Sequence, residues 1–276
     1  MNPAGGYHAA MNPRLVPHAL LIALIATACK VEPAPEDLDG LAHWFWQHLD
    51  DEDPEALQAG AANLYAALDA ASFEGPTDGS ISTLSVEELA LVDKAGESLQ
   101  DLYGVFMAND VACSTALLEY QIYAQEQDEM HPGTYVSYER EYTSDLEAYQ
   151  ARDSDRLTWR STYEVEDTGV SYQASILGTL RWVESIDDEL PGPLLVSRGV
   201  LEAPAYTNDD QDRGMFQDYQ LEVYFPRGDD TLHMYAMWRD AVFFGLDFGN
   251  AGMQTFVLDG MAGWDADSET LCGVGP

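Results

Sequence analysis

Acidic side chains gather in three short clusters that could bind a cation. The clusters span residues 50–53, 208–212 and 265–269. Oxygen-rich loops of this kind bind Ca2+ in exported proteins at roughly millimolar concentrations. Asn208, Asp210 and Asp212 stand at alternate positions and are weak calcium candidates. Arg213 and Tyr219 replace the glycine and the bidentate glutamate of an EF-hand, so a solvated acidic surface is the alternative.

Motifs for catalysis are missing from the sequence. It contains no Gly-x-Ser-x-Gly elbow, His-Glu-x-x-His zinc motif, phosphate-binding loop or dinucleotide-binding glycine pattern. With 49 acidic residues, pairs of carboxylates are uninformative. We therefore name no catalytic residue, no metal ligand beyond the weak calcium candidates and no other cofactor. A hydrolase whose Ser-His-acid or two-carboxylate site assembles only in space is left open.

Large aromatic side chains recur within runs of period two. Trp159, Trp182 and Trp238 alternate there with small residues, and Tyr172 belongs to the same pattern. Alternation of large and small residues lets a sheet curve, and an aromatic concavity under helices could hold an apolar ligand. These four residues are our candidate ligand-lining residues. A packed aromatic core is the alternative.

The elements that must position these residues fall into two regions. Residues 38–133 carry mainly helical signals, with apolar residues at helical spacing from Leu38 to Leu49 and a second helix from Asp53 to Ala70. A capping box at 85–88 predicts a third helix that ends near residue 103. Residues 73–83 are expected to be a linker. The stretch 110–126 fits helix or strand, and we favour helix.

Residues 134–276 alternate with a period of two, as antiparallel strands do when one face is buried. The expected strands lie near 143–151, 157–165, 170–182, 194–202, 219–225, 232–238 and 252–259. Segregated helices and strands predict an α+β fold, an N-terminal helical segment packed on a curved antiparallel sheet of seven or more strands. Residues 38–276 are expected to form one compact unit. A sheet covered in this way is similar in shape to START-like ligand-binding domains.

Two cysteines, Cys113 and Cys272, lie within residues 38–276. In an exported protein such a pair predicts one disulfide, and two separate buried thiols are the alternative. The bridge would stabilise the fold by roughly 5 kcal/mol in the chain-entropy model.

The N-terminus carries a leader. Arg14 precedes the unbroken apolar run Ala19–Ala26, which is too short to span a bilayer and fits the core of a signal peptide. Small residues then lead to Cys29. Residues 11–30 resemble the signal peptides of bacterial lipoproteins, whose lipobox ends in a cysteine. Met11 begins a better leader than Met1, so we expect translation to start there.

The resemblance implies that residues 1–28 are removed and that Cys29 is acylated and becomes the N-terminus. Residues 29–37 are Pro-rich and would act as an extended tether. By the usual sorting rule, Lys30 after the cysteine implies the outer membrane, on either its periplasmic or its surface face.

The net charge limits which partners the protein can bind. Forty-nine acidic against twelve basic residues give a net charge of −37, which excludes nucleic acid as a partner. We expect a lipid-anchored, acidic cell-envelope lipoprotein with a binding or structural role. Its partners would be the membrane through the anchor, and an envelope protein or an apolar small molecule. The alternatives are a START-like carrier of an apolar small molecule and a hydrolase without a motif.

Overall fold

The computed structural model describes residues 33–70, 72–74, 76–167, 170–184, 192–207 and 210–274. The expected leader, Cys29 and the calcium candidate Asn208 lie outside these residues. Residues 33–276 belong to one compact unit. No helix within the described ranges is both long and apolar enough to cross a bilayer.

The described residues form seven helices and one ten-stranded sheet, which confirms the α+β class. The helices are α1 Leu38–His48, α2 Glu55–Ala67, α3 Val86–Ala90, α4 Thr115–Tyr123, α5 Gln127–Met130, α6 Leu146–Gln150 and α7 Ala251–Val274. The strands are β1 Thr77–Ile81, β2 Tyr103–Val111, β3 Ser137–Tyr142, β4 Arg156–Asp167, β5 Val170–Val183, β6 Leu194–Leu201, β7 Ala205–Thr207, β8 Asp210–Arg227, β9 Asp230–Phe243 and β10 Leu246–Asp247.

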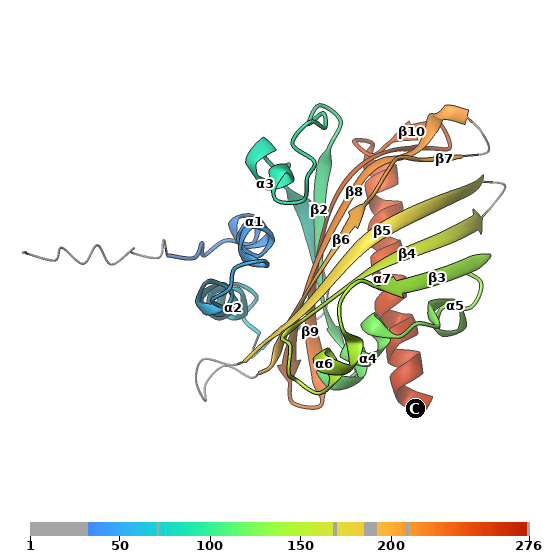
Figure 1. Ribbon diagram of the computed structural model, residues 1–276. Coiled ribbons are helices and arrows are strands. Elements are labelled where there is room, and N and C mark those ends of the chain that lie inside the picture. The colour runs from blue at the N-terminus through green and yellow to red at the C-terminus, as the bar shows by residue number, and fades with distance from the viewer. Residues whose placement is uncertain are drawn as a thin grey trace, which may run out of the picture. The chain divides into compact units, whose positions relative to one another are not determined.

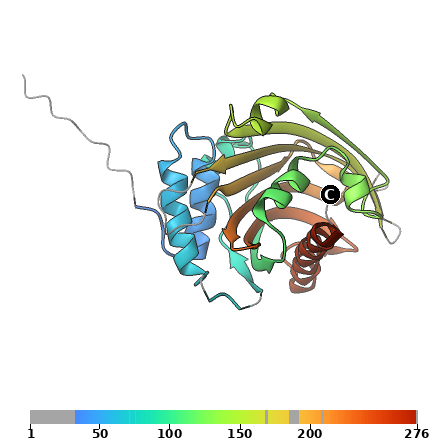
Figure 2. The ribbon, with the colours of Figure 1, turned by 90° about the horizontal axis from the view of Figure 1, so that it is seen from below.

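Every strand is antiparallel to its neighbours. The order across the sheet is β1-β2-β9-β8-β6-β5-β4-β3, with β10 beside β9 and β7 beside β5 and β8. The sheet curls, so that α1 and α2 lie against its outer face while α4 and α7 lie on the concave face (Figures 1 and 2).

Both faces of the central strands are buried, because helices cover both. Leu232, Met234 and Trp238 of β9 pack with α1 and α2 in the largest core cluster. The alternate residues Tyr235 and Met237 pack with α7 in a separate cluster. The sheet therefore has a separate hydrophobic cluster on each face, one beneath α1 and α2 and one beneath α7.

Local signals explain several element ends. Ser85 Oγ accepts from the Glu88 backbone amide while Glu88 accepts from that of Ser85, which confirms the capping box. The expected helix to residue 103 is wrong, because α3 ends at Ala90. Asp93, at φ 60°, closes it with the backbone hydrogen bond from Lys94 to Leu89, in the manner of a Schellman motif.

Three other expectations are also corrected. The expected strand near 252–259 lies in α7, where Met253, Val257 and Met261 are buried at a spacing of four. The region 143–151 contains α6 in place of a strand. The expected linker 73–83 contains β1, which pairs with β2 at the sheet edge. The ambiguous stretch 110–126 is mainly helix, as α4.

Candidate ligand cavity

A cavity of about 740 Å3 lies between the concave face of the sheet and the helices α4, α5 and α7. Lining residues stand at alternate positions of β3, β4, β5, β8 and β9, because successive residues of a strand point to opposite faces, and β6 contributes residues 197–199. The sheet curls around α4 and α7, which lie on its concave face (Figure 2), and residues of both helices line the cavity. The space between helices and sheet on this face is therefore hollow.

One wall of the cavity is aromatic. The rings of Tyr135 and Tyr163 lie 5.4 Å apart in a T-shaped arrangement, and Tyr138 stacks on Tyr163 at 6.4 Å. Trp159 lies flat over β5 at Gly178, where a Cβ atom would come within 2.1 Å of the indole ring. A glycine at this position therefore shapes the wall. Burial, together with the nearby phenol groups, raises the pKa of Tyr135 and Tyr163, so both stay neutral.

Arg140 borders this wall. Its guanidinium lies 4.7 Å above the Trp159 ring, and Nη1 donates to the carbonyls of Ile122 at 2.6 Å and Ala124 at 2.9 Å. These carbonyls close the last turn of α4, where backbone acceptors lack partners within the helix. Arg140 thus fastens α4 to β3 and covers an aromatic ring.

The floor of the cavity, built by β8 and β9, is polar. Asp218 accepts from Arg239 Nε at 2.7 Å and from the amide of Gln220, whose own oxygen accepts from the Tyr235 hydroxyl. Asp218 is fully buried, and a buried carboxylate is tolerated only when it is paired in this way.

His233 lies at the end of this floor, beneath α7. Its Nδ1 is 2.8 Å from Asp265 and its Nε2 is 3.4 Å from Glu222, which also accepts from the Tyr224 hydroxyl. The ring stacks on Tyr224 at 4.2 Å. Burial disfavours a charged imidazole, but the charge and hydrogen bond of Asp265, with Glu222, outweigh it and raise the pKa of His233 to about 9. His233 is therefore an imidazolium at neutral pH.

Cavity-lining side chains also keep polar atoms without hydrogen-bond partners among the described residues. These atoms are Gln121 Oε1, His131 Nδ1, Arg198 Nη1 and His233 Nε2. All four side chains are buried, with at most 9% of each residue exposed. His131 Nδ1 and His233 Nε2 each lie within 3.5 Å of a carboxylate, that of Asp267 and that of Glu222.

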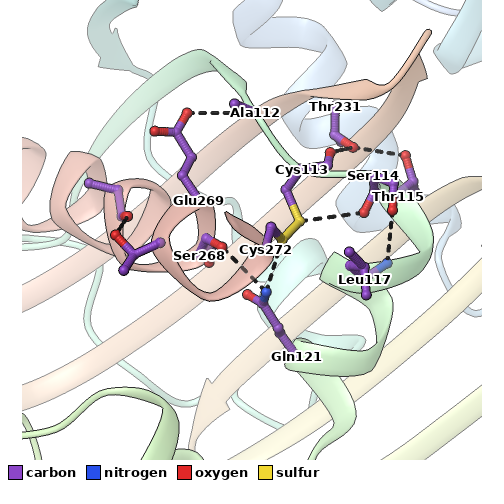
Figure 3. Close-up of a disulfide and its surroundings, with 12 residues drawn as sticks. Ala112, Cys113, Ser114, Thr115, Leu117, Gln121, Thr231, Ser268, Glu269 and Cys272 are labelled. Atoms are coloured by element: carbon purple, nitrogen blue, oxygen red, sulfur yellow. Dashed lines mark hydrogen bonds between the residues drawn. A yellow bond between two sulfur atoms is a disulfide. The ribbon is translucent and has the colours of Figure 1, made fainter. Parts of the chain in front are cut away.

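The disulfide predicted from the sequence is present and ties α7 to the cavity roof. Cys113, between β2 and α4, is joined to Cys272 near the end of α7, with their Cα atoms 5.6 Å apart. Gln121 of α4 reaches toward Ser268 and Cys272 (Figure 3). The bridge thus holds the helix that covers the cavity against α4.

The four candidate lining residues do not lie together. Trp159 and Tyr172 line the cavity. Trp238 faces the opposite side, fully buried against α1, and donates to the Ser82 carbonyl at 2.7 Å. Trp182 lies near the end of β5 and is not part of the lining. The Arg152 guanidinium carbon lies 5.1 Å from the centre of the Trp182 ring. Register with the neighbouring strand, which sets Trp238 opposite Tyr219, decides this placement.

The sequence singled out neither the lining residues of β3, β8 and β9 nor those of α4, α5 and α7. Asp265 belongs to one of the acidic clusters, but it lies on a helix and is 4% exposed. The signal that could have found Asp265 is the helical spacing of Met and Val residues before it in α7. The glycines of α7 obscured this signal, because glycine has a low helix propensity.

The remaining calcium candidates make ordinary surface contacts. Asp210 lies 3.4 Å from Arg213 Nε and accepts from the backbone amide of Asp212 at 3.0 Å. Within the described ranges, no group of three or more His, Cys, Asp or Glu side chains is arranged to hold a metal ion.

A Ser-His-acid arrangement does occur away from the cavity. His43 Nε2 is 3.0 Å from Ser82 Oγ, and Nδ1 is 2.7 Å from Glu88. Burial disfavours a charged His43, but Glu88, with Asp39, outweighs it and raises the pKa of His43. The Ser82 hydroxyl donates to Asp39 at 2.8 Å.

The Ser82 hydroxyl donates to Asp39, so its proton does not point to His43. Ser82 lies outside the cavity lining. We interpret the group as a structural clamp between α1 and the segment that joins β1 to α3.

No protein-family model matches the chain, and no curated protein matches it. Solved structures give low-scoring matches. Human STARD10 has a TM-score of 0.39 at 7% identity, covering 68% of this chain and 81% of that chain. Ara h 8.0201 has a TM-score of 0.37 at 8% identity, covering 61% and 96%. A STAR-related lipid transfer protein fragment from Xanthomonas axonopodis has a TM-score of 0.33 at 7% identity, covering 54% and 84%. Such scores leave the choice of ligand to the chemistry of the cavity.

Proposed function

We propose that this chain is a carrier that binds an apolar small molecule in the cavity under α7. The observation that carries the proposal is the hollow of about 740 Å3 beneath the helices. Small-molecule sites have volumes of roughly 300–1,000 Å3 and combine apolar and aromatic walls with a few polar groups. This cavity has that composition, with an aromatic wall on β3–β5 and a polar floor on β8 and β9.

A packed core is the competing interpretation of the same aromatic residues. Protein interiors leave few voids larger than a water molecule, and a cavity of this size forfeits the contacts that packing would provide. The opposite face of the sheet, where α1 and α2 cover Leu221, Val223 and Trp238, is solid. The contrast between the two faces supports binding over a purely structural role.

The leader supports a second part of the proposal. An acylated Cys29 would hold the carrier at the bacterial outer membrane, close to a source of apolar molecules. The charge of −37 would keep anionic partners away from the folded part.

The direct test is to look for a ligand. The full chain is purified without detergent, extracted with organic solvent and analysed by mass spectrometry, and the emptied protein is titrated with N-phenyl-1-naphthylamine. We expect about one molecule of extracted ligand or probe per chain.

Two variants assign that binding to the cavity. Gly199 lines the cavity, and the atoms nearest to a Cβ there, from Gln220 and Ile176, are 3.5 Å away, so Gly199→Phe should fill the space and reduce probe binding at least tenfold. Leu177→Phe, on the outward face of β5 and 38% exposed, is the matched control and should bind normally. If the folded protein carries no co-purified ligand and also fails to bind the probe, the carrier function is refuted.

A further inference from the structure

Arg239 of β9 presents hydrogen-bond donors to the cavity. The residue lines the cavity, and 16% of its side chain remains exposed. Among the described residues, its guanidinium donates one hydrogen bond, from Nε to Asp218 at 2.7 Å. Nη1 and Nη2 therefore have no acceptor there, and neither is among the fully buried atoms that lack a partner. Both Nη groups thus keep accessible surface that a bound molecule can reach.

A chain of hydrogen bonds holds the guanidinium in place. Asp218 stands opposite Arg239 on the neighbouring strand β8 and is fully buried. Its other oxygen accepts from Gln220 at 2.6 Å, and Gln220 accepts from the Tyr235 hydroxyl at 2.9 Å. The carboxylate takes the Nε–H and leaves the outer edge of the guanidinium, with Nη1 and Nη2, without an acceptor. Donors that are held in this way cost little further ordering when a ligand binds.

Apolar and aromatic side chains lie around this cation. The Phe248 ring is 6.0 Å from the guanidinium carbon. Burial raises the pKa of Tyr163, and the nearby charge of Arg239 opposes that rise, so the aromatic wall lies close to the cation. Ile176 and Met237 line the same cavity. Because such surroundings lower the local dielectric constant, a hydrogen bond from Arg239 is stronger here than in water.

Charge at this end of the cavity favours an uncharged ligand. Burial would lower the pKa of Arg239, but the charge and hydrogen bond of Asp218 outweigh it and raise that pKa, so the two side chains form a balanced ion pair. A ligand carboxylate would add a buried charge without a counter-ion of its own, which is costly. An ammonium group has no acceptor for the Nη donors.

A carbonyl oxygen meets both requirements, because it accepts hydrogen bonds and carries no charge. A hydroxyl group would also bring a donor, but the Asp218 and Gln220 oxygens on the floor already accept hydrogen bonds. Hydrogen bonds from a charged donor are stronger than those between neutral groups, so Arg239 can select for the carbonyl.

We infer that the cavity binds an uncharged apolar molecule whose carbonyl oxygen accepts hydrogen bonds from Nη1 and Nη2 of Arg239. This inference rests on the proposed carrier function and names its ligand class. Long-chain ketones and esters share this chemistry.

The test compares head groups on similar chains. The emptied full chain is loaded with N-phenyl-1-naphthylamine, which is displaced with 2-dodecanone, 1-dodecanol, dodecanoate and 2-methyl-1-dodecene. The last compound has the shape of the ketone, with a CH2 group in place of the oxygen. We expect 2-dodecanone to bind more tightly than 1-dodecanol and at least tenfold more tightly than dodecanoate.

A double variant assigns that binding to Arg239. Arg239→Met removes the donors, and Asp218→Asn beside it leaves no buried charge alone. The affinity for 2-dodecanone should fall about tenfold in this variant, while that for 2-methyl-1-dodecene should not change. Arg160→Met with Glu202→Gln is the matched control, because this ion pair, at 2.8 Å, lies outside the cavity lining.

Infrared spectroscopy on the unmodified protein gives a second readout, also if the double variant fails to fold. The carbonyl stretch of bound 2-dodecanone should lie at a lower frequency than that of the ketone in hexane, because hydrogen bonds weaken the carbonyl bond. The control variant should show the same lowered frequency.

The outcomes separate the two proposals. If the probe does not bind at all, the carrier function itself fails. If the probe binds but 1-dodecanol or dodecanoate competes as well as 2-dodecanone, the carbonyl assignment is overturned. An unshifted carbonyl stretch, or an affinity for 2-dodecanone that the double variant retains, would also overturn it.

Discussion

At the scale of single residues, burial and partners decide what each ionisable group does. Ser82, His43 and Glu88 have the spacing of a catalytic triad, yet the proton positions set by Asp39 make the group a clamp. Burial would raise the pKa of Glu88, but its hydrogen bonds with His43 and Ser85 outweigh this and lower it to about 2. Spacing alone therefore does not define an active site.

The clamp makes stability depend on pH. The pKa of Glu88 is lower in the folded protein than its ordinary 4.5, so its contribution is present above pH 4.5 and is lost as pH falls toward 2. The pKa of His43 is raised, so its contribution is present below pH 6.5 and is lost as pH rises through the folded value. The clamp is fully formed between these limits.

We expect Glu88→Gln to lower the free energy of unfolding by about 3 kcal/mol at pH 5.5. The difference from the unmodified protein should shrink as the pH is lowered toward 2.5. Urea denaturation at a series of pH values measures it, with the exposed Glu87→Gln on the same helix as control. Parallel pH curves for Glu88→Gln and the unmodified protein would contradict the shift.

At the scale of elements, α7 governs access to the cavity. Phe256, Gly260 and Trp264 recur at a spacing of four and all line the cavity, yet Phe256 is 57% exposed and Trp264 is 37% exposed. Side chains that are both lining and exposed mark the rim. The cavity therefore opens along this stripe of α7.

Filling the rim should slow exchange of the ligand. A Cβ at Gly260 or at Gly263 meets no atom within 4 Å, but only Gly260 lines the cavity. We expect Gly260→Phe to slow association and release of N-phenyl-1-naphthylamine about tenfold, because entry then needs a rearrangement. Stopped-flow fluorescence measures both rates. Gly263→Phe, which raises helix propensity equally, should leave them unchanged; equal effects of the two variants would place the opening elsewhere.

At the scale of the whole molecule, the folded unit is strongly acidic and closed by one long-range bridge. The cystine joins residues 159 positions apart, and a loop of that length stabilises the folded state by about 5 kcal/mol in the chain-entropy model. An oxidising compartment is needed for such a bridge to persist. This fits the export that the leader predicts.

The anchor is tested on the intact chain. Cys29→Ala should move the protein from the membrane fraction to the soluble fraction or leave the leader uncut, because buried acyl chains contribute about 0.8 kcal/mol per CH2. Thr27→Ser, which keeps a small residue before the cysteine, should behave as the unmodified protein does. Fractionation and intact-mass analysis measure both, and an unmodified thiol at Cys29 in membrane-bound protein would refute the anchor.

Features that depend on neighbouring residues were predictable. Local patterns, which do not depend on tertiary contacts, predicted the capping box at Ser85–Glu88, the period-two runs of β4 and β5, and the α+β class. The helix α7 was not predicted, because its glycines at 252, 260 and 263 weaken the helical pattern of Met253 and Val257.

The sequence by itself determined five adjacent strands of the sheet, β4, β5, β6, β8 and β9, and an even pair of cysteines, since a period of two is a local pattern. Only the tertiary structure decided that Trp159 and Trp238 lie on opposite faces and that His233 of β9 meets Asp265 of α7. Helices cover both faces of β9, so no polar alternation marks which face is which. The register between strands resolves that choice, and register is set by contacts between residues far apart in the chain.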